Sequence, residues 1–297
     1  MIVDCHTHVW QTPEQLGQMD LGESPRAASR PRQTTGKLTA SPNKGTWRAV
    51  PAADADHHWA QNTAVDKSIV LGFKSRYMGA EIPNRYVADY VARFPSKLIG
   101  FAGIDPTERS AVEEVRIAKE ELKLRGITLS PANQDFHPAD SRAMGVYAEA
   151  ERLGMPVLVH PVGKFTEESK LEFARPYLFD EVARTFPKLR IVVAQLGQPW
   201  VDETICLLGK HPHVYADVSG MLSRPWQAYN ALVNCYQYGV VDKLLFGSDF
   251  PYTSAAECIE ALYSLNQIAH GTNLPLVPRE SLRGIVERDA LSLLGIA

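Results

Sequence analysis

Two histidines close the first apolar run of the chain, and they are the first residues whose type and spacing suggest chemistry. Residues 2–8 read IVDCHTH, so that His6 and His8 are two positions apart. In a β-strand, side chains at this spacing project from the same face. Two imidazoles on one face make half of a divalent-metal site, although a bare His-x-His motif also occurs often by chance.

Two other apolar runs end in residues that would complete such a site. His160 directly follows the run 157–159, and Asp249 closes the segment 243–249. Three histidines and one carboxylate form an N₃O ligand set that suits zinc or a similar divalent ion such as Mn²⁺. We therefore predict one divalent metal ion, with Zn²⁺ as the first choice, held by His6, His8, His160 and Asp249.

The segments that carry these residues belong to a regular alternation of short apolar strands and amphipathic helices. Continuous apolar strands with intervening helices indicate a parallel sheet covered by helices, and eight such units favour a closed (β/α)₈ TIM barrel. The C-terminal ends of all strands then meet at one mouth, where catalytic residues lie. The expected strands are 2–8, 67–72, 98–105, 126–130, 156–160, 189–195, 214–218 and 243–249. The expected helices are 84–94, 110–124, 141–153, 173–186, 201–210, 225–238, 255–270 and 279–294.

Length and composition agree with one soluble barrel domain over residues 1–297. A single barrel needs ~250 residues, and the chain has 297. A formal net charge of -3 gives no basic footprint for nucleic acid or for an anionic membrane. No apolar run approaches the ~20 residues of a spanning helix, and no secretory signal is visible. Four scattered cysteines without a Cys-x-x-Cys motif are typical of reduced thiols in a cytoplasmic protein.

A long insertion follows the first strand. Residues 11–53 are rich in Pro, Gly, Ser, Thr and Gln and show little periodicity, so a loop is expected. Its position after the histidine strand would let it cap the site, with Trp47 as its anchor, but a surface insertion without a role is equally compatible. His57 and His58, just after the insertion, are expected at the surface, where the first helix begins.

Four motifs together resemble the amidohydrolase superfamily. They are DCHTH at 4–8, VHP at 159–161, LGQPW at 196–200 and FGSDFP at 246–251. More narrowly, they resemble its amidohydrolase-related branch, which includes aminocarboxymuconate-semialdehyde decarboxylase-like enzymes and dicarboxylate lactonases. The resemblance covers the chain to residue 295 apart from the insertion, and its motifs are not specific for one substrate. It implies a (β/α)₈ barrel whose metal is held by the four residues already identified, and dimers are common in this branch.

The chain departs from the family pattern at two positions. Some members bridge two metals with a carboxylated lysine at the end of strand four, whereas residues 126–130 here read GITLS, which favours a single ion. Many relatives have a histidine at the end of strand six, where this chain has Gln195. A glutamine amide donates and accepts hydrogen bonds but carries no proton at neutral pH. Asp249 then handles the proton alone, or the reaction differs, or activity has been lost.

These residues lead to three functional hypotheses. In the first, the protein is a hydrolase in which a metal-activated water attacks a small lactone, ester or amide. Asp249 would transfer the proton, and Gln195 would bind the substrate oxygen. The alternative is a metal-dependent, non-oxidative decarboxylase of a small unsaturated or aromatic acid, against which Gln195 counts modestly. The third is a barrel that binds a small ligand without catalysis.

Three residues near the predicted mouth are candidates for substrate binding. Trp200 could form an apolar wall, and Arg224 could pair with a substrate carboxylate because guanidinium groups suit bidentate recognition. His137, in the loop after strand four, could approach the mouth. The expected partner is thus a small-molecule substrate, and a homodimer is compatible with the resemblance.

Strand parity leads to expectations for the neighbours of the histidines. Alternation along 2–8 places Asp4 on the inward face with His6, in a structural role, and turns Cys5 outward beneath a helix. Asp217, inside the seventh strand, and Ser219, just after it, are expected to make hydrogen bonds at the barrel rim, with contact to the substrate as the alternative.

Overall fold

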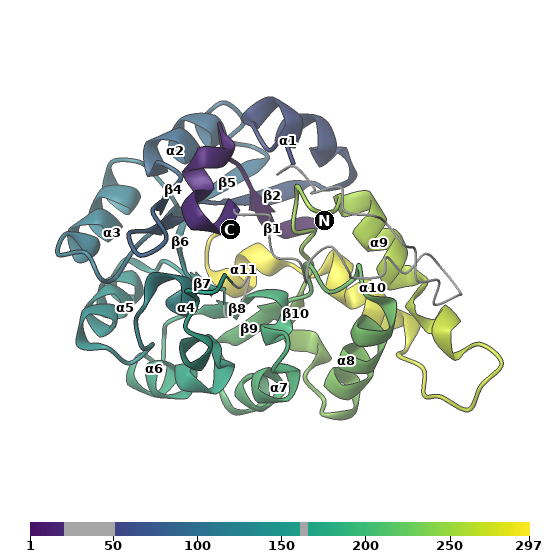
Figure 1. Cartoon of the computed structure of the whole chain (residues 1–297). Coiled ribbons are helices and arrows are strands. Elements are labelled where there is room, and N and C mark those ends of the chain that lie inside the picture. Colours follow the sequence, from purple (N-terminus) through teal and green to yellow (C-terminus); the bar gives the residue numbers. More distant parts are fainter. Residues whose placement is uncertain (21–50, 161–165) are drawn as a thin grey trace.

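Eight parallel strands form a barrel in the computed structural model, which describes residues 1–20, 51–160 and 166–297 (Figure 1). Neighbouring strands in the barrel follow chain order, as the predicted fold requires. All eight predicted strands are present, each of them shorter than expected. They are β1 (Val3–His8), β2 (Lys67–Leu71), β5 (Leu98–Gly103), β6 (Gly126–Leu129), β7 (Val157–Val159), β8 (Ile191–Val193), β9 (Val214–Asp217) and β10 (Leu244–Leu245).

Backbone hydrogen bonds between the first strand and the segment after β10 close the barrel. Cys5 N donates to Phe246 O at 2.9 Å, and His8 N donates to Phe250 O at 2.9 Å. Asp249 N donates to His6 O at 3.0 Å. The same bonds bring the two ends of the predicted ligand set together.

Helices surround the barrel and cover its outer face (Figure 1). Five predicted helices appear as single helices: α2 (Asn84–Ala92), α3 (Ala111–Glu120), α5 (Ser141–Leu153), α7 (Val201–Lys210) and α8 (Pro225–Gln237). The other three are divided. The predicted helix 173–186 consists of the 3-10 turns η3 (Leu171–Ala174) and η4 (Pro176–Leu178) followed by α6 (Phe179–Thr185). The predicted helix 255–270 consists of α9 (Ala255–Tyr263) and η7 (Leu265–Ala269), and 279–294 consists of α10 (Arg279–Glu287) and α11 (Ala290–Leu294).

Helix α1 (Ala55–Gln61) contains His57 and His58, where the first helix was expected to begin. Several short elements were not predicted. They are η2 (Asn62–Ala64), the hairpin of β3 (Lys74–Ser75) with β4 (Ala80–Glu81), α4 (Pro131–Gln134), η5 (Ala194–Gly197) and η6 (Val241–Lys243). Most span a turn or less, which is too short for a periodic apolar pattern to show. Within the described ranges, no helix combines the length and the apolar character needed to cross a membrane.

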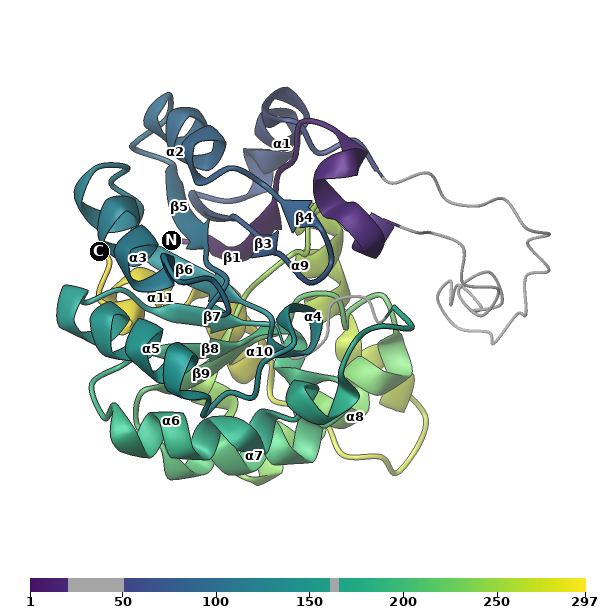
Figure 2. The same ribbon diagram turned by 60° about the vertical axis from the view of Figure 1, so that its left-hand side comes forward.

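Alternate side chains of the strands build two separate cores. One set packs between the strands and the helices, as Val70 and Ile127 do. The other fills the barrel and packs against α11, where Leu291 and Leu294 contribute. In Figure 2, α11 lies at one end of the barrel, while α4 and the 3-10 helix η1 (Pro13–Asp20) lie toward the other. The terminal helix thus closes the end of the barrel opposite the mouth.

A β-bulge in β1 overturns the predicted parity of two residues. Asp4 pairs with Ser68 and Thr7 pairs with Val70, so two residues of β1 lie opposite one residue of β2. Cys5 therefore points into the barrel core with Leu71, not outward. Asp4 lies on the outer face, where its Oδ1 accepts hydrogen bonds from the backbone N–H groups of His6 (3.2 Å) and Ser248 (2.9 Å). The structural role expected for Asp4 holds, but its inward orientation was wrong.

The described parts of the 11–53 insertion lie close to the strand end. Residues 13–20 form the 3-10 helix η1 rather than the expected irregular loop, and η1 contacts β4. At the other end of the insertion, Trp10 N donates to Ala53 O at 3.0 Å, so both ends return to the end of β1. Trp47, the predicted anchor, lies outside the described residues.

Candidate metal centre

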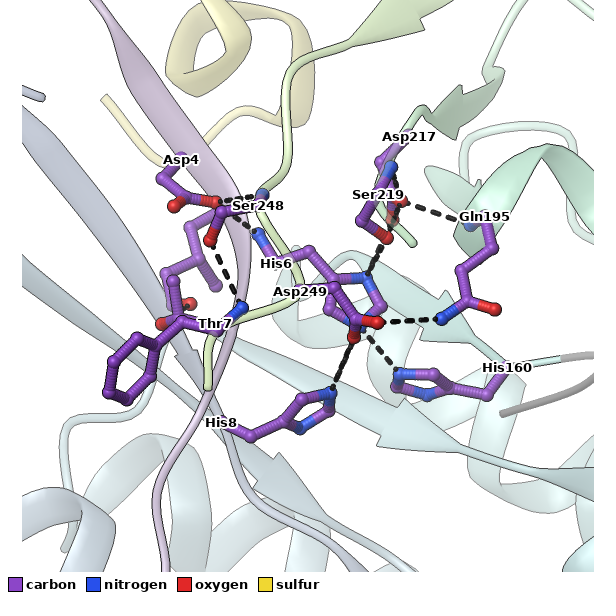
Figure 3. A network of polar contacts seen from close by, with 12 residues as sticks. Asp4, His6, Thr7, His8, His160, Gln195, Asp217, Ser219, Ser248 and Asp249 are labelled. Carbon is purple, nitrogen blue, oxygen red and sulfur yellow. Dashed lines mark hydrogen bonds and ion pairs between the residues drawn. The ribbon is translucent and has the colours of Figure 1, made fainter. Parts of the chain in front are cut away.

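Three histidines from two strands converge at the barrel mouth, as Figure 3 shows. His6 and His8 come from β1, and His160 directly follows β7. The Nε2 atom of His6 lies 3.0 Å from Nε2 of His8 and 3.1 Å from Nε2 of His160. One ring nitrogen from each of the three lies within 4.8 Å of the others, so this group can bind a metal ion.

The spacing of these nitrogens fits ligation to one ion. Ligands ~2.1 Å from an ion lie about 3.4 Å apart in a tetrahedral site and about 3.0 Å apart at an octahedral right angle. The two observed separations of 3.0 and 3.1 Å lie within this range. The donor set therefore fits a divalent ion, and the spacing does not distinguish Zn²⁺ from Mn²⁺.

Asp249 supplies a carboxylate beside the histidines. Its Oδ1 lies 3.5 Å from Nε2 of His6 and 3.6 Å from Nε2 of His8. Its backbone adopts a left-handed conformation with φ of 64°, uncommon for a residue other than glycine. The bond from Asp249 N to His6 O holds this conformation, which brings the carboxylate toward the histidines. The structure thus places all four predicted ligands together.

Asp217, at the end of β9, orients His6. Its Oδ2 lies 2.9 Å from Nδ1 of His6, and both side chains are fully buried. A carboxylate accepts hydrogen bonds, so Nδ1 carries the proton and the lone pair of neutral His6 is at Nε2, facing the other two histidines. Ser219 Oγ donates to Oδ1 of Asp217 and lies 3.1 Å from Nδ1 of His6. Asp217 was predicted as a rim residue or a substrate contact and not as the partner of His6, although it ends an apolar strand just as the candidate ligands do.

Burial and nearby charges set the protonation of the histidines. Burial lowers the pKa of His160 well below its usual value, and the neighbouring histidines lower it further. Burial also lowers the pKa of His8. For His6, burial acts in the same direction, but the charge and hydrogen bond of Asp217 outweigh it and raise the pKa. Neutral His8 and His160 suit ligation, whereas a proton on His6 would compete with a metal ion.

Gln195 occupies an unusual backbone conformation at the end of β8. Gln195, Leu196 and Gly197 all have positive φ, at 54°, 50° and 66°. In this turn, the backbone N–H of Gln195 donates to Oδ1 of Asp217 at 3.0 Å. The side-chain Nε2 of Gln195 donates to Oδ2 of Asp249 at 3.3 Å (Figure 3). Gln195 thus contacts both carboxylates of the site.

Two glycines make room for this arrangement. A Cβ atom on Gly220 would lie 2.8 Å from Nε2 of Gln195 and 3.1 Å from Oδ2 of Asp249. A Cβ atom on Gly247 would lie 2.9 Å from Cβ of His6 and 3.2 Å from Cβ of Ser219. Both contacts are closer than packed carbon atoms normally allow, so the site depends on the absence of side chains at these two positions.

The other three predicted substrate-binding residues have contacts with side chains outside the histidine group. Trp200 is half-buried, packs beside Ala132 and Ala174, and has the Arg175 guanidinium 5.5 Å from its ring centroid. Arg224 is exposed, and its Nη1 donates to Oε1 of Gln198 at 3.3 Å.

His137 is also exposed, and its ring packs edge-on against Phe173 at 5.9 Å. The described contacts of Trp200, Arg224 and His137 do not include the three histidines. Their predicted contact with a substrate therefore stays a prediction.

Comparison with known families identifies the kind of protein. The family profile described as amidohydrolase matches residues 3–295. The chain belongs to the amidohydrolase family. This family comprises metal-dependent enzymes, in agreement with the resemblance drawn from the four sequence motifs. No curated protein matches the sequence.

Solved structures of similar fold include a protein described as uncharacterized, a probable hydrolase and a decarboxylase. An uncharacterized TIM-barrel protein from Bordetella bronchiseptica is 20% identical, with a TM-score of 0.70, and 99% of this amidohydrolase and 98% of that chain are covered. A probable 2-pyrone-4,6-dicarboxylic acid hydrolase from Acinetobacter baumannii, with citric acid bound, is 14% identical, with a TM-score of 0.64 and 99% of each chain covered. A dihydroxybenzoic acid decarboxylase from a Polaromonas species, with bound manganese and the inhibitor 2-nitroresorcinol, is 15% identical, with a TM-score of 0.61 and coverage of 99% and 97%. These likenesses support the barrel fold.

Proposed function

We propose that this amidohydrolase is a metal-dependent hydrolase that acts on a small lactone, ester or amide. The observation that carries the proposal is the convergence of three Nε2 atoms beside the Asp249 carboxylate. The hydrogen bond from His6 Nδ1 to Asp217 supports it, because this bond sets the tautomer that ligation requires.

One divalent ion, with Zn²⁺ as the first choice and Mn²⁺ as the alternative, would be held by His6, His8, His160 and Asp249. When bound, such an ion polarises a carbonyl oxygen and lowers the pKa of water toward ~7. Three nitrogens and one carboxylate form a donor set common in zinc enzymes. The manganese in the decarboxylase of similar fold supports retaining the alternative.

In the proposed mechanism, Asp249 carries the proton. Its carboxylate faces the histidine nitrogens through Oδ1, where it can take a proton from the attacking water and deliver it to the leaving group. Its Oδ2 accepts a hydrogen bond from Gln195, which holds the carboxylate in place. The Gln195 amide has a second N–H that can bind the substrate oxygen. Gln195 thus orients groups and transfers no proton.

The substrate is proposed to be a small molecule that bears a carboxylate. Arg224 would pair with this carboxylate, while Trp200 and His137 would line the approach to the histidines. The carboxylates of the named substrate and of the bound citric acid of the probable dicarboxylic acid hydrolase support this class.

The main alternative is non-oxidative decarboxylation of a small unsaturated or aromatic acid. The decarboxylase of similar fold supports considering it. Decarboxylation requires delivery of a proton to carbon, and Gln195 cannot supply one. This difference favours hydrolysis.

The test combines metal analysis with product analysis. Protein purified without chelator should contain about one divalent ion per chain and should hydrolyse members of a panel of lactones, esters and amides. Asp249→Asn should lower turnover at least ~100-fold, because it removes the acid–base group. The matched control is Asp66→Asn, whose carboxylate accepts from Ile2 N at the opposite end of β1 and should be dispensable.

Three results would contradict the proposal. Carbon dioxide release without hydration would indicate the decarboxylase, and absence of stoichiometric metal would indicate the non-catalytic barrel. A metal-loaded Asp249→Asn enzyme with full activity would exclude the proton-transfer role of Asp249.

The proposal also covers the setting in which the enzyme works. We place it in the cytoplasm, supported by four cysteines that are all free thiols. We propose that it has no nucleic-acid or membrane partner, supported by the formal net charge of -3. We also propose a homodimer, as is common in the branch that the sequence motifs resemble.

A further inference from the structure

His58 lies in a buried polar network on the outer side of the ligand strand. It was expected at the surface, but only 2% of its area is exposed, between α1, α2 and β1. Its Nδ1 lies 2.7 Å from the Tyr90 hydroxyl, and its Nε2 lies 2.9 Å from Oγ1 of Thr7. Thr7 Oγ1 in turn donates to Ile69 O at 2.7 Å. We call these three hydrogen bonds the His58 relay.

The direction of each hydrogen bond in the relay is determined. Thr7 has a single hydroxyl proton and donates it to Ile69 O, so its oxygen accepts from Nε2–H of His58. Nδ1 of neutral His58 then accepts from the Tyr90 hydroxyl. Every polar atom of the relay is paired, and none has an alternative role without breaking another bond.

Thr7 is the first residue of β1 after the bulge, where regular pairing with β2 resumes at Val70. Cys5 and His6 together lie opposite Ile69, so the strand alternation restarts after the bulge. Thr7 on the outer face therefore keeps its neighbours His6 and His8 facing the barrel mouth. In Figure 3, Thr7 lies on the other side of the β1 ribbon from these two histidines.

The two sides of the bulge are fixed by different contacts. Before it, Asp4 accepts the His6 and Ser248 backbone N–H groups. After it, the only side chains that bond Thr7 Oγ1 in the described residues belong to the relay. We propose that His58 is a positioning residue for the metal centre, which it holds in register through Thr7. This inference rests on the proposed metal site and adds to it a residue from outside the barrel.

The test compares variants that remove or keep the relay. Thr7→Val keeps the shape of the side chain and removes the hydroxyl, whereas Thr7→Ser keeps the hydroxyl. His58→Phe removes the imidazole. The matched control is Ser68→Ala, which removes an equally buried hydroxyl from the outer face of the neighbouring strand, where it donates to Asn62 Oδ1 at 2.6 Å. The full-length protein is titrated with Zn²⁺ and with Mn²⁺ in competition with a chelating dye.

Thr7→Val and His58→Phe should each bind both ions about tenfold more weakly, at the lower end of the effect of losing a hydrogen-bond partner of a ligand. The double variant should bind no more weakly than either single variant, because both changes break the same relay. Thr7→Ser and Ser68→Ala should bind as the wild type does, even though Ser68→Ala loses thermal stability. If His58→Phe fails to fold, the Thr7 pair decides the question.

Failure of this inference differs from failure of the proposed function. If the wild type binds neither ion stoichiometrically, the metal centre and the positioning role are both overturned. If the wild type binds an ion and Thr7→Val binds it as tightly as Ser68→Ala does, only the positioning role is overturned. Nitrogen NMR of the metal-free protein determines which ring nitrogen of His58 carries the proton. A proton on Nδ1 of His58 would exclude the relay.

Discussion

Replacing Asp217 by asparagine should weaken the binding of a metal ion at the proposed site while leaving most of the fold intact. The fully buried Asp217 carboxylate accepts from Gln195 N at 3.0 Å, from Ser219 N at 3.0 Å and from the Ser219 hydroxyl, all at Oδ1. Its Oδ2 accepts from Nδ1 of His6 at 2.9 Å. An asparagine side chain has nearly the same shape, but one of its two ends donates.

The side-chain amide of the Asp217→Asn variant can take two orientations, which differ in the number of hydrogen-bond donors that face its NH₂ group. With the NH₂ group at the Oδ1 position, it faces the backbone N–H groups of Gln195 and Ser219, and no rearrangement of hydrogens relieves these two conflicts. Only the Ser219 hydroxyl could turn to accept from it. With the NH₂ group at the Oδ2 position, it faces only His6, and His6 can move its proton from Nδ1 to Nε2. The second orientation is therefore favoured. It places a proton on the nitrogen that ligation needs.

The expected magnitudes follow from this single exchange. Metal affinity should fall about 10- to 100-fold, or roughly 1.4 to 2.7 kcal/mol, as for other partners that orient ligands. The free energy of unfolding should fall by only about 1.5 to 3 kcal/mol, the contribution of one hydrogen bond to a charged group. Competition with a chelating dye measures the first quantity, and urea unfolding of the metal-free protein measures the second.

A control and a spectroscopic measurement complete the test. Ser219→Ala removes one donor to Asp217 but keeps the carboxylate, so its metal affinity should stay near that of the wild type. Nitrogen NMR of metal-free Asp217→Asn should show the proton of His6 on Nε2. An Asp217→Asn protein that binds metal as tightly as the wild type, with the proton still on Nδ1, would refute the reasoning.

Three further predictions concern neighbouring groups. Gly247→Ala should displace His6, because the new methyl group would lie 2.9 Å from Cβ of His6. Metal affinity should fall, and the free energy of unfolding should fall by about 1 to 3 kcal/mol. Dye competition measures the first loss, and urea unfolding measures the second. Gln195→His should place a titratable group beside Asp249 and add an ionisation near pH ~6.5 to the pH–rate profile, and an unchanged profile would count against the contact. Burial lowers the pKa of His58 from 6.5 to about 4, so the unfolded chain takes up this proton first and stability falls as pH decreases through that window. The loss amounts to about 3 kcal/mol relative to His58→Phe, measured by unfolding the metal-free proteins at each pH.

The barrel and the convergence of the four candidate ligands were predictable because the signals are local. Each strand is a short apolar run, and His160 and Asp249 stand at the ends of such runs, where a parallel barrel gathers side chains at one mouth. The orientation of Asp4 and Cys5 was not predictable in this way. It depends on one extra residue in β1, and the contacts that hold this bulge come from Ser248 and from other distant segments. Simple alternation therefore gives the wrong face.

His58 shows a second limit of local patterns. Its helix has only seven residues, and its partners Thr7 and Tyr90 are 51 and 32 positions away in the chain. A histidine pair after a polar insertion has the composition of a surface segment, and only the packing of α1 against β1 and α2 makes one of the two histidines a buried residue. The other, His57, is exposed, and its Nδ1 lies 2.6 Å from Oδ2 of Asp54.

The replacement of a titratable residue by Gln195 acquires a physical meaning from its two contacts. Its backbone N–H reaches Asp217, which orients His6, and its side chain reaches Asp249. One left-handed turn after β8 therefore links the carboxylate that sets the His6 tautomer to the carboxylate proposed to move the proton. The side-chain amide donates to Asp249 without adding a charge between the two carboxylates, whereas a protonated imidazole would attract both and compete with a metal ion for Asp249. Gln195 thus favours a site in which all proton transfer passes through Asp249.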